Sequence, residues 1–397
     1  MAHQVRHDMA VTYRRDEIAR QGFVTGARRY VLNDLARHLR TTYERKVQPA
    51  AQAKGTALND GPAIHKAMKP ETMFKFYSTL RGTAQELVWR SVLPGIEREA
   101  EDLAARADSL GGRPGANDAM VSLQDGFKVP RSVTELDVHL MPGAYQAETF
   151  PGDVSQGALY DNGLSVFLMG YLGPDMDDTG RSVSRYLKAR FPTFAPRRML
   201  DIGCTIGFNT LPWQETYPGL VIDAIDPCAP NLRYGAARTR AKGHSVHYHQ
   251  MIGEDLKFAD ASFDLVWSAM VLHEMTAAGV RQCMQECFRV LKPGGLMIHM
   301  ELPPNSAVPA YEQFYLDWDA YYNKEPWYKK FRDTDLKSLV THGGFAAEKY
   351  FYYVIPSHHN AGDAAVVNAA IADAAPTGGN VGRLADGLRW FTFGAWK

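Results

Sequence analysis

Two acidic residues close short apolar runs and are the clearest candidates for ligand binding. Asp201 ends one such run, and Asp226 ends the run Leu220–Ile225, 25 residues further along the chain. An acid at the end of a parallel strand can accept hydrogen bonds from both hydroxyls of a ribose. The spacing therefore predicts a nucleoside site with Asp226 at the ribose. The alternative is that Asp226 is a solvated turn acid before Pro227.

A glycine turn follows the first acid directly. Gly203 has no Cβ to block a bound group, and a helix that begins after Gly207 would point its free N–H groups into the same crevice. The turn does not read GxGxxG, because Cys204, Thr205 and Ile206 separate the two glycines. This disfavours a pyrophosphate cradle, although the spacing of the acids keeps a nicotinamide-dependent dehydrogenase as an alternative. A tight turn that binds no ligand is the other interpretation.

His273 is the candidate catalytic residue. It follows a third apolar run, Phe263–Trp267, and Glu274 is its neighbour. A neutral imidazole can take a proton from a hydroxyl near pH 7, and Glu274 could orient it. The alternative is a histidine that packs against or caps the local helix.

Aromatic residues are dense in one later segment. This density predicts a lid at about 305–335 over the substrate, because aromatic walls suit a flat or cationic acceptor. Tyr311, Tyr315 and Trp318 share one helical face and are the first candidates for substrate contact. The alternative is that these rings pack on the sheet.

The cysteines predict neither a metal site nor a disulfide framework. Cys283 and Cys287 lie four residues apart, but two soft ligands without partners rarely hold a metal, so we expect them to pack. The chain has four cysteines, which is too few for a disulfide framework at this length. We expect reduced thiols and no metal.

The elements that would position these residues alternate between strand and helix. From Arg198 onward, apolar strand-like runs are separated by helical stretches, a pattern typical of a parallel sheet covered by helices. The predicted strands of this α/β domain are Met199-Leu200, Leu220–Ile225, His244–His249, Phe263–Trp267 and Leu296–Met300.

The first 110 residues are predicted to be helical. Val31, Leu32, Leu35 and Leu39 recur at helical spacing, and a glycine-rich breaker follows at 111–115. We place a boundary near residue 150. The expected domains are a helical amino-terminal domain, 1–150, and a ligand-binding α/β domain, 151–397.

Composition excludes several classes of protein. The 397 residues carry 44 Lys and Arg against 44 Asp and Glu, so no overall basic field favours nucleic acid as a partner. Hydrophobic residues make up 45% and charged residues 22%, as in globular proteins. No apolar run approaches the roughly 20 residues of a membrane span, and the first residues do not form an apolar signal segment. We therefore expect a cytoplasmic protein without a membrane partner.

Three segments together resemble a known family. They are 200–204, Phe263–Glu274 and Arg289–Ile298. These runs resemble the class I S-adenosylmethionine-dependent methyltransferases, specifically the small-molecule branch that contains the ubiquinone and menaquinone methylases. The match covers roughly residues 185–355 and the last strand. It implies a seven-stranded, doubly wound, Rossmann-like sheet, with Phe345–Ile355 and an antiparallel Leu388–Trp396 as its last strands.

The resemblance also implies a cofactor, S-adenosylmethionine (SAM), and the residues that hold it. These are Asp201, Gly203 and Gly207 at the methionine part, Asp226 at the ribose, and Ser268 and Met270 over the methyl donor. Tyr160 is assigned to the substrate by position alone.

Two departures from the family pattern affect this transfer. Thr205 stands where the family often has a middle glycine. Ile252 stands where an acid usually meets the adenine amine, and Glu254 or Asp255 could substitute for it, next to Gly253. The alternative is that both acids are solvated at a helix start.

The predicted reaction is in-line attack by a small-molecule acceptor on the sulfonium methyl, with oxygen favoured as the accepting atom. The alternatives are S- or N-methylation, a nicotinamide-dependent dehydrogenase, and a non-catalytic cofactor-binding scaffold. By resemblance, the amino-terminal helices either wall the acceptor pocket or build a homodimer.

Overall fold

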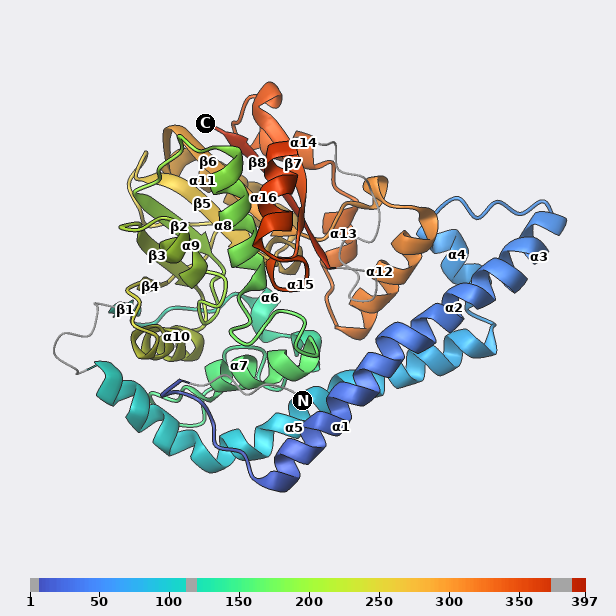
Figure 1. Cartoon of the computed structure of the whole chain (residues 1–397), viewed down its shortest axis with the longest axis horizontal. Helices are drawn as coiled ribbons and strands as arrows, with labels where there is room; N and C mark the ends of the chain where they lie inside the picture. Colours follow the sequence, from blue (N-terminus) through green and yellow to red (C-terminus); the bar gives the residue numbers. More distant parts are fainter. Residues whose placement is uncertain (1–6, 112–119, 373–387) are drawn as a thin grey trace.

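A computed structural model describes residues 7–111, 120–372 and 388–397. Within them the chain forms one mixed sheet of eight strands in the order β1-β4-β3-β2-β5-β6-β8-β7 (Figure 1). The strands are β1 Met120–Ser122, β2 Arg198–Ile202, β3 Val221–Asp226, β4 His247–Gln250, β5 Phe263–Ala269, β6 Leu291–Glu301, β7 Tyr350–Pro356 and β8 Arg389–Trp396.

The topology confirms the predicted doubly wound sheet. Strands β1 to β6 are parallel to one another, whereas β8 is antiparallel to both β6 and β7. The strand order reverses between β2 and β5, and such a switch point opens a crevice at the carboxyl ends of the strands. Seven strands match the predicted runs. The eighth, β1, was not predicted and lies at the edge beside β4.

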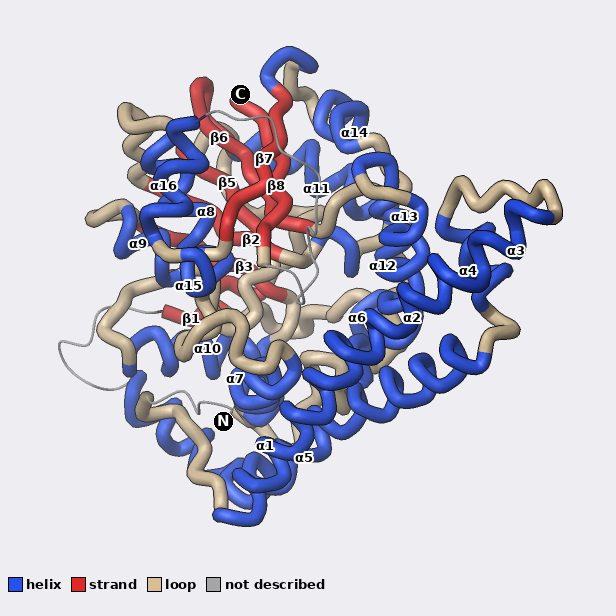
Figure 2. Tube along the Cα trace, turned by 45° about the vertical axis from the view of Figure 1, so that its right-hand side comes forward, coloured by secondary structure: helices blue, strands red, loops and turns tan. Residues whose placement is uncertain are grey.

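Helices cover both faces of the sheet because its strands are apolar on both sides. Leu265 and Trp267 of β5 face one part of the core, and Val266 between them faces the other, as the two-residue period of a strand requires. The first face packs on α8 Asp178–Arg190, α9 Leu211–Thr216 and α10 Ala229–Ala241, and the second on α11 Ala277–Val290 and α14 Leu336–His342. Figure 2 shows the strands enclosed between these helices.

The amino-terminal region is helical, as predicted. In Figure 1 its two long helical stretches form an arm that reaches from below the sheet to the right-hand side. One stretch comprises α1 Arg15–Arg29, η1 Tyr30–Leu35, α2 Ala36–Thr42, η2 Tyr43–Val47 and α3 Gln48–Ala53; α4 Gly61–Met68 and the 40-residue α5 Thr72–Gly111 follow.

This helical region shares a core with the sheet domain. Val88 and Trp89 of α5 pack in the same cluster as Leu159 and Val166 of α7 Ser155–Phe167. The far end of the arm packs on α12 Ala310–Tyr322. The boundary near residue 150 stays a prediction, and β1 of the sheet lies on its amino-terminal side.

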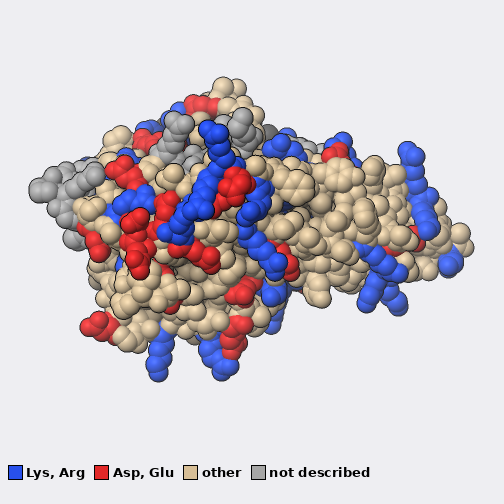
Figure 3. All heavy atoms as spheres, turned by 90° about the horizontal axis from the view of Figure 1, so that it is seen from below, with Lys and Arg blue, Asp and Glu red and all other residues tan. Residues whose placement is uncertain are grey.

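Shorter elements connect these parts. They are α6 Arg131–Thr134, η3 Val138–Leu140, η4 Leu272–Glu274, η5 Asn305–Ala307, α13 Tyr328–Arg332, η6 Ala347–Lys349, α15 His358–Ala361 and α16 Asp363–Ala372. None of the described helices combines the length and apolarity needed to cross a membrane. Figure 3 shows basic and acidic side chains interspersed on one face of the molecule.

Candidate functional site

A cavity of about 330 Å³ opens at the carboxyl ends of β2, β3 and β5. It continues away from the sheet to α1, α5, α7 and α12, so the amino-terminal helices form part of its wall. Most of its lining is apolar. The cavity therefore lies at the switch point of the sheet, where ligands bind in open α/β folds.

The glycine turn forms one edge of the cavity. Gly203 has φ +71°, and a Cβ there would lie 2.4 Å from Cγ2 of Val271. Thr205, at the position of the family's middle glycine, adopts φ +51° and donates its backbone N–H to Oδ2 of Asp226 at 3.1 Å. Thr205 therefore preserves the turn and fastens it to the second acid.

Asp226, the predicted ribose ligand, lies on the cavity wall. Its Oδ1 accepts the backbone N–H of Cys228 at 2.9 Å, and burial raises its pKa to about 6. A carboxylate held by two backbone N–H groups keeps lone pairs for ligand hydroxyls. Its ionised form therefore predominates at neutral pH and can accept the hydrogen bonds of a ribose.

Asp201 and Gly207 support the turn from outside the cavity lining. Thr210 donates its hydroxyl to Oδ2 of Asp201 at 2.5 Å, and burial raises the pKa of Asp201 to about 7. A Cβ on Gly207 would lie 2.2 Å from the Tyr248 hydroxyl. The structure thus brings Gly203, but neither of these two residues, to the cavity.

The segment after β4 provides the opposite edge. Ile252, Gly253 and Glu254 line the cavity, and burial raises the pKa of Glu254. Asp255, the other candidate for the adenine amine, is exposed and pairs with Lys257. Of the two acids, the structure therefore places Glu254 at the cavity.

Ser268 and Met270, at the carboxyl end of β5, lie in different environments. Met270 lines the cavity with φ +57°. Ser268 is fully buried behind the wall, with its Oγ 2.7 Å from Nδ1 of His299. Because successive residues of a strand point to opposite faces, Ser268 and its neighbour Ala269, which lines the cavity, cannot face the same side.

His273 lies on the cavity wall and is 2% exposed. Its Nδ1 lies 2.5 Å from Oε2 of Glu301, whose Oε1 accepts the backbone N–H groups of Val271 and Leu272. Burial lowers the pKa of His273, but Glu301 outweighs burial and raises it to about 9. The expectation that Glu274 orients this imidazole is wrong, because Glu301 occupies that position.

Glu274 instead belongs to a second histidine site at the cavity. Nε2 of His139 lies 3.2 Å from Glu274, and its Nδ1 lies 3.0 Å from Glu325. Burial opposes protonation, yet the two carboxylates raise the pKa of His139 to about 10. Tyr145 also donates its hydroxyl to Glu274, at 3.4 Å.

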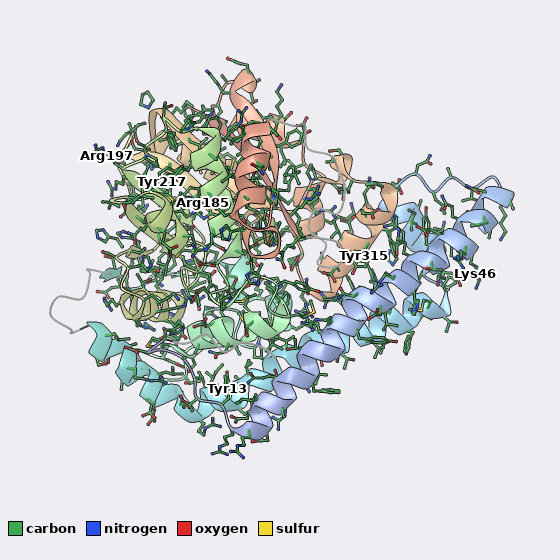
Figure 4. All side chains as sticks on the ribbon, in the orientation of Figure 1. Tyr13, Lys46, Arg185, Arg197, Tyr217 and Tyr315 are labelled. Carbon is green, nitrogen blue, oxygen red and sulfur yellow. The ribbon has the colours of Figure 1, made fainter. Side chains whose placement is uncertain are left out.

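The three aromatic candidates of α12 do not share one environment. Tyr315 lines the cavity and accepts the hydroxyl hydrogen of Tyr77 at 3.0 Å; Figure 4 marks it on α12, beside the long helices. The structure places Tyr311 and Trp318 elsewhere. The ring centroid of Tyr311 lies 4.9 Å from that of Tyr43, and the ring centroid of Trp318 lies 4.4 Å from that of His65. The amino-terminal helices cover that side of α12. Tyr160, predicted from position alone, lines the cavity.

Sequence reasoning missed Glu301, His139 and Glu325. Glu301 carried a signal, because it closes the apolar run of β6 just as Asp226 closes that of β3. His139 lies in the three-residue element η3 and Glu325 lies outside the helices and strands, so no periodicity marks either residue. No group of three or more residues suited to a metal occurs in the part of the chain that the structure describes.

Fold and site together define a doubly wound α/β protein with a cavity at the carboxyl edge of its parallel strands. The residues present fit SAM, because the cavity is lined both by a buried carboxylate, Asp226, and by the Gly203 turn, where a Cβ would meet Val271.

Comparison with known proteins finds a similarity over the central part of the sheet domain. Residues 200–299 match the family model described as a methyltransferase domain. The match indicates a methyltransferase domain in this part of the chain, and SAM is the cofactor that such domains use.

Its relatives include an uncharacterized methyltransferase of Synechocystis, 27% identical over 157 residues, which cover 40% of this chain and 70% of that protein. A malonyl-[acyl-carrier protein] O-methyltransferase of Enterobacter lignolyticus is 32% identical over 30% of this chain and 45% of its own length. A demethylmenaquinone methyltransferase of Thermus thermophilus is 31% identical over 28% of this chain and 49% of its own length. The chain thus spans about half the length of the last two.

Among solved structures, a phosphoethanolamine N-methyltransferase of Haemonchus contortus aligns with a TM-score of 0.37 and 16% identity, over 58% of this chain and 59% of that one.

Proposed function

We propose that this protein transfers a methyl group from SAM to an oxygen of a small-molecule acceptor. The observation that carries the proposal is that one cavity holds both the Gly203 and Asp226 edge and the buried pair of His273 and Glu301. A donor site and a proton-accepting group thus share one enclosed space.

Each side chain has a distinct task in this reaction. Asp226 and Glu254 hold the adenosine part, and the backbone at Gly203 leaves room for the methionine part. When bound, SAM supplies a methyl carbon made electrophilic by the sulfonium charge. Nε2 of His273 takes the proton of the acceptor hydroxyl as the oxygen–carbon bond forms and the carbon–sulfur bond breaks. The apolar wall excludes water and aligns the reactants.

Glu301 is the positioning residue for this proton transfer. It fixes Nδ1 of His273 and stabilises the imidazolium that forms. Because the pKa of His273 is about 9, the free protein holds this imidazole protonated at neutral pH. The rate is therefore expected to rise with pH up to about 9. This buried dyad favours a hydroxyl over a thioether, which has no proton to lose.

The amino-terminal helices, in this proposal, wall the acceptor end of the cavity. Arg28, Leu32 and Arg81 from that region lie on its lining. A homodimer, a cytoplasmic location and the absence of a nucleic-acid partner stay predictions.

Methyl transfer is tested with tritium-labelled SAM and a fractionated metabolite extract. We expect label in a small molecule as a methyl bound to oxygen, and a His273→Ala variant that loses turnover far more than SAM affinity. In a second experiment, calorimetry measures the affinity of the protein for SAM and for NAD. Binding of NAD without SAM would favour a dehydrogenase, and SAM binding without any labelled acceptor would favour a scaffold.

A further inference from the structure

Two buried arginines line the cavity at its end away from the sheet. Arg28 of α1 and Arg81 of α5 are each 1% exposed. Nη1 of each guanidinium donates to the same oxygen, Oε1 of Gln85, at 2.7 Å. Two cations therefore share one neutral acceptor in the wall of the cavity.

Only one of these cations has an anionic partner in the part of the chain that the structure describes. Nε of Arg81 donates to Oδ1 of Asp319 at 2.6 Å, and its Nη2 donates to Asn323. Despite burial, Asp319 raises the pKa of Arg81. Asp319 therefore compensates the charge of Arg81.

Arg28 has neutral acceptors alone among the described residues. Its Nε donates to the backbone carbonyl of Phe167 at 2.5 Å, and its Nη1 bonds to Gln85. No described residue accepts from Nη2 or forms an ion pair with this guanidinium. Burial and the nearby Arg81 lower the pKa of Arg28. The centroid of the Phe167 ring lies 4.2 Å from Cζ of Arg28, and Asp319 acts on both guanidinium groups but pairs directly with Arg81. An arginine keeps its charge in a protein, so among the described residues two cations share one carboxylate at this end of the cavity.

A buried charge is stable when it is paired and hydrogen-bonded, and arginine pairs best with a planar oxyanion. The cavity lining carries the apolar side chains of Leu32, Leu164 and Leu168, as well as the paired Arg81 and Asp319. A singly charged carboxylate on an apolar body matches both features. A phosphate would bring a second negative charge into the same apolar surroundings.

We propose that the acceptor is a carboxylic acid with an apolar body, whose carboxylate pairs with Nη2 of Arg28 while its hydroxyl is methylated. The inference rests on the proposed function for the methylation and on the cavity wall for the carboxylate. Arg28 then sets substrate specificity and takes no part in the chemistry.

The test measures binding, so it does not depend on turnover. Protein saturated with S-adenosylhomocysteine is titrated in a calorimeter with benzoate, cinnamate and octanoate, and with the neutral amide of each. At least one acid is expected to bind ten-fold or more tightly than its amide. Arg28→Met is expected to lower the affinity for that acid to that of the amide. Arg20→Met removes an exposed arginine from the same helix and is expected to keep the preference.

The Arg28→Lys variant keeps the charge and carries the test if Arg28→Met does not fold. It is expected to weaken acid binding several-fold and leave amide binding unchanged. Three results would overturn the inference: no acid binds, acids and amides bind equally, or Arg28→Met keeps the preference. Tighter binding of phenyl phosphate than of benzoate would overturn the assignment to a carboxylate.

Separate titration with SAM distinguishes the two proposals. If SAM binds and labels only neutral acceptors, the carboxylate inference fails and methyl transfer stands. If an acid binds through Arg28 and SAM does not bind, methyl transfer fails and the anion site stands.

Discussion

Acidic side chains at the carboxyl ends of neighbouring strands do different work because their partners differ. Asp226 accepts two backbone N–H groups and remains open to the cavity. Glu301 also accepts two backbone N–H groups, but its second oxygen is taken by His273. Asp201 accepts the hydroxyl of Thr210 behind the wall. Asp226 is therefore available to a ligand, Glu301 raises the pKa of His273, and Asp201 supports the glycine turn.

Replacing Glu301 by glutamine should move the pH dependence of turnover. Burial lowers the pKa of His273, but Glu301, followed by Glu325 and Glu274, raises it from an ordinary 6.5 to about 9, so removing the charge of Glu301 lowers that pKa. The imidazole then loses its proton at lower pH, so the rise of kcat with pH, which has its midpoint at about 9 in the parent protein, moves to lower pH. Glu348→Gln, at an exposed position, should leave the profile unchanged. A midpoint that stays at about 9 in Glu301→Gln would remove Glu301 as the positioning residue.

Replacing Asp226 by alanine should weaken SAM binding by about 1–3 kcal/mol, because a charge-assisted hydrogen bond is lost. In the parent protein, SAM affinity should also fall as pH drops through about 6, since protonation removes the carboxylate that accepts the ribose hydroxyls. Calorimetry over pH measures both effects. Asp255→Ala is the matched control, since Asp255 is exposed beside the same edge. Equal SAM affinity in parent and Asp226→Ala would place the ribose elsewhere.

The sequence predicted the residues at this edge only where a strand end marks them. Asp226 and Gly203 end or follow apolar runs, and both lie at the cavity. Ser268 and Asp201 satisfy the same pattern but lie behind the wall. The register and twist of the strands decide which residues at a strand end face the cavity. Neither the register nor the twist can be predicted from the local sequence.

The turn between β2 and the following helix depends on two glycines, Gly203 and Gly207, which both have a positive φ and a close neighbour. Gly203 combines a positive φ with close approach to Val271. Gly203→Ala should therefore add a steric cost of about 1–3 kcal/mol to the backbone cost of about 1–2 kcal/mol. Gly219→Ala is the control, because Gly219 has φ +83° and nothing lies within 4 Å of its missing Cβ. Urea unfolding measures the difference, and equal losses in both variants would contradict the close approach.

The element α12 shows why an aromatic face could not be assigned from spacing. Tyr311, Tyr315 and Trp318 share a helical face, yet Tyr315 alone lines the cavity. The other two rings pack against Tyr43 of η2 and His65 of α4, which lie more than 240 residues earlier in the chain. Helical periodicity predicts a buried face. It does not identify what buries that face.

The whole molecule is joined through one core that runs from the amino-terminal helices into the sheet. Trp89 of α5 is 1% exposed, packs against Gly163 of α7 and donates its Nε1–H to the carbonyl of His139 at 2.8 Å. The helical region thus holds His139, a residue of the cavity wall.

The predicted boundary near 150 was based on the prolines and glycines of the chain. Strand β1, on the amino-terminal side of that boundary, has only three residues and is too short to show periodicity.

Trp89→Ala should cost about 3–5 kcal/mol of unfolding free energy, because a large buried side chain leaves a cavity. Helix content by circular dichroism and tertiary structure by fluorescence should still change in one transition, since the core is continuous. Phe76→Ala on the same helix, where Phe76 is 52% exposed, should change stability by about 0.5 kcal/mol or less. Two separated transitions in the parent protein would contradict the continuous core.

A crystal structure with S-adenosylhomocysteine is the most direct measurement. We expect the ribose hydroxyls at Asp226, the adenine beside Gly253 and Glu254, and the sulfur directed along the cavity toward His273. A crevice filled by side chains, or a ligand bound away from Asp226, would contradict methyl transfer at this site.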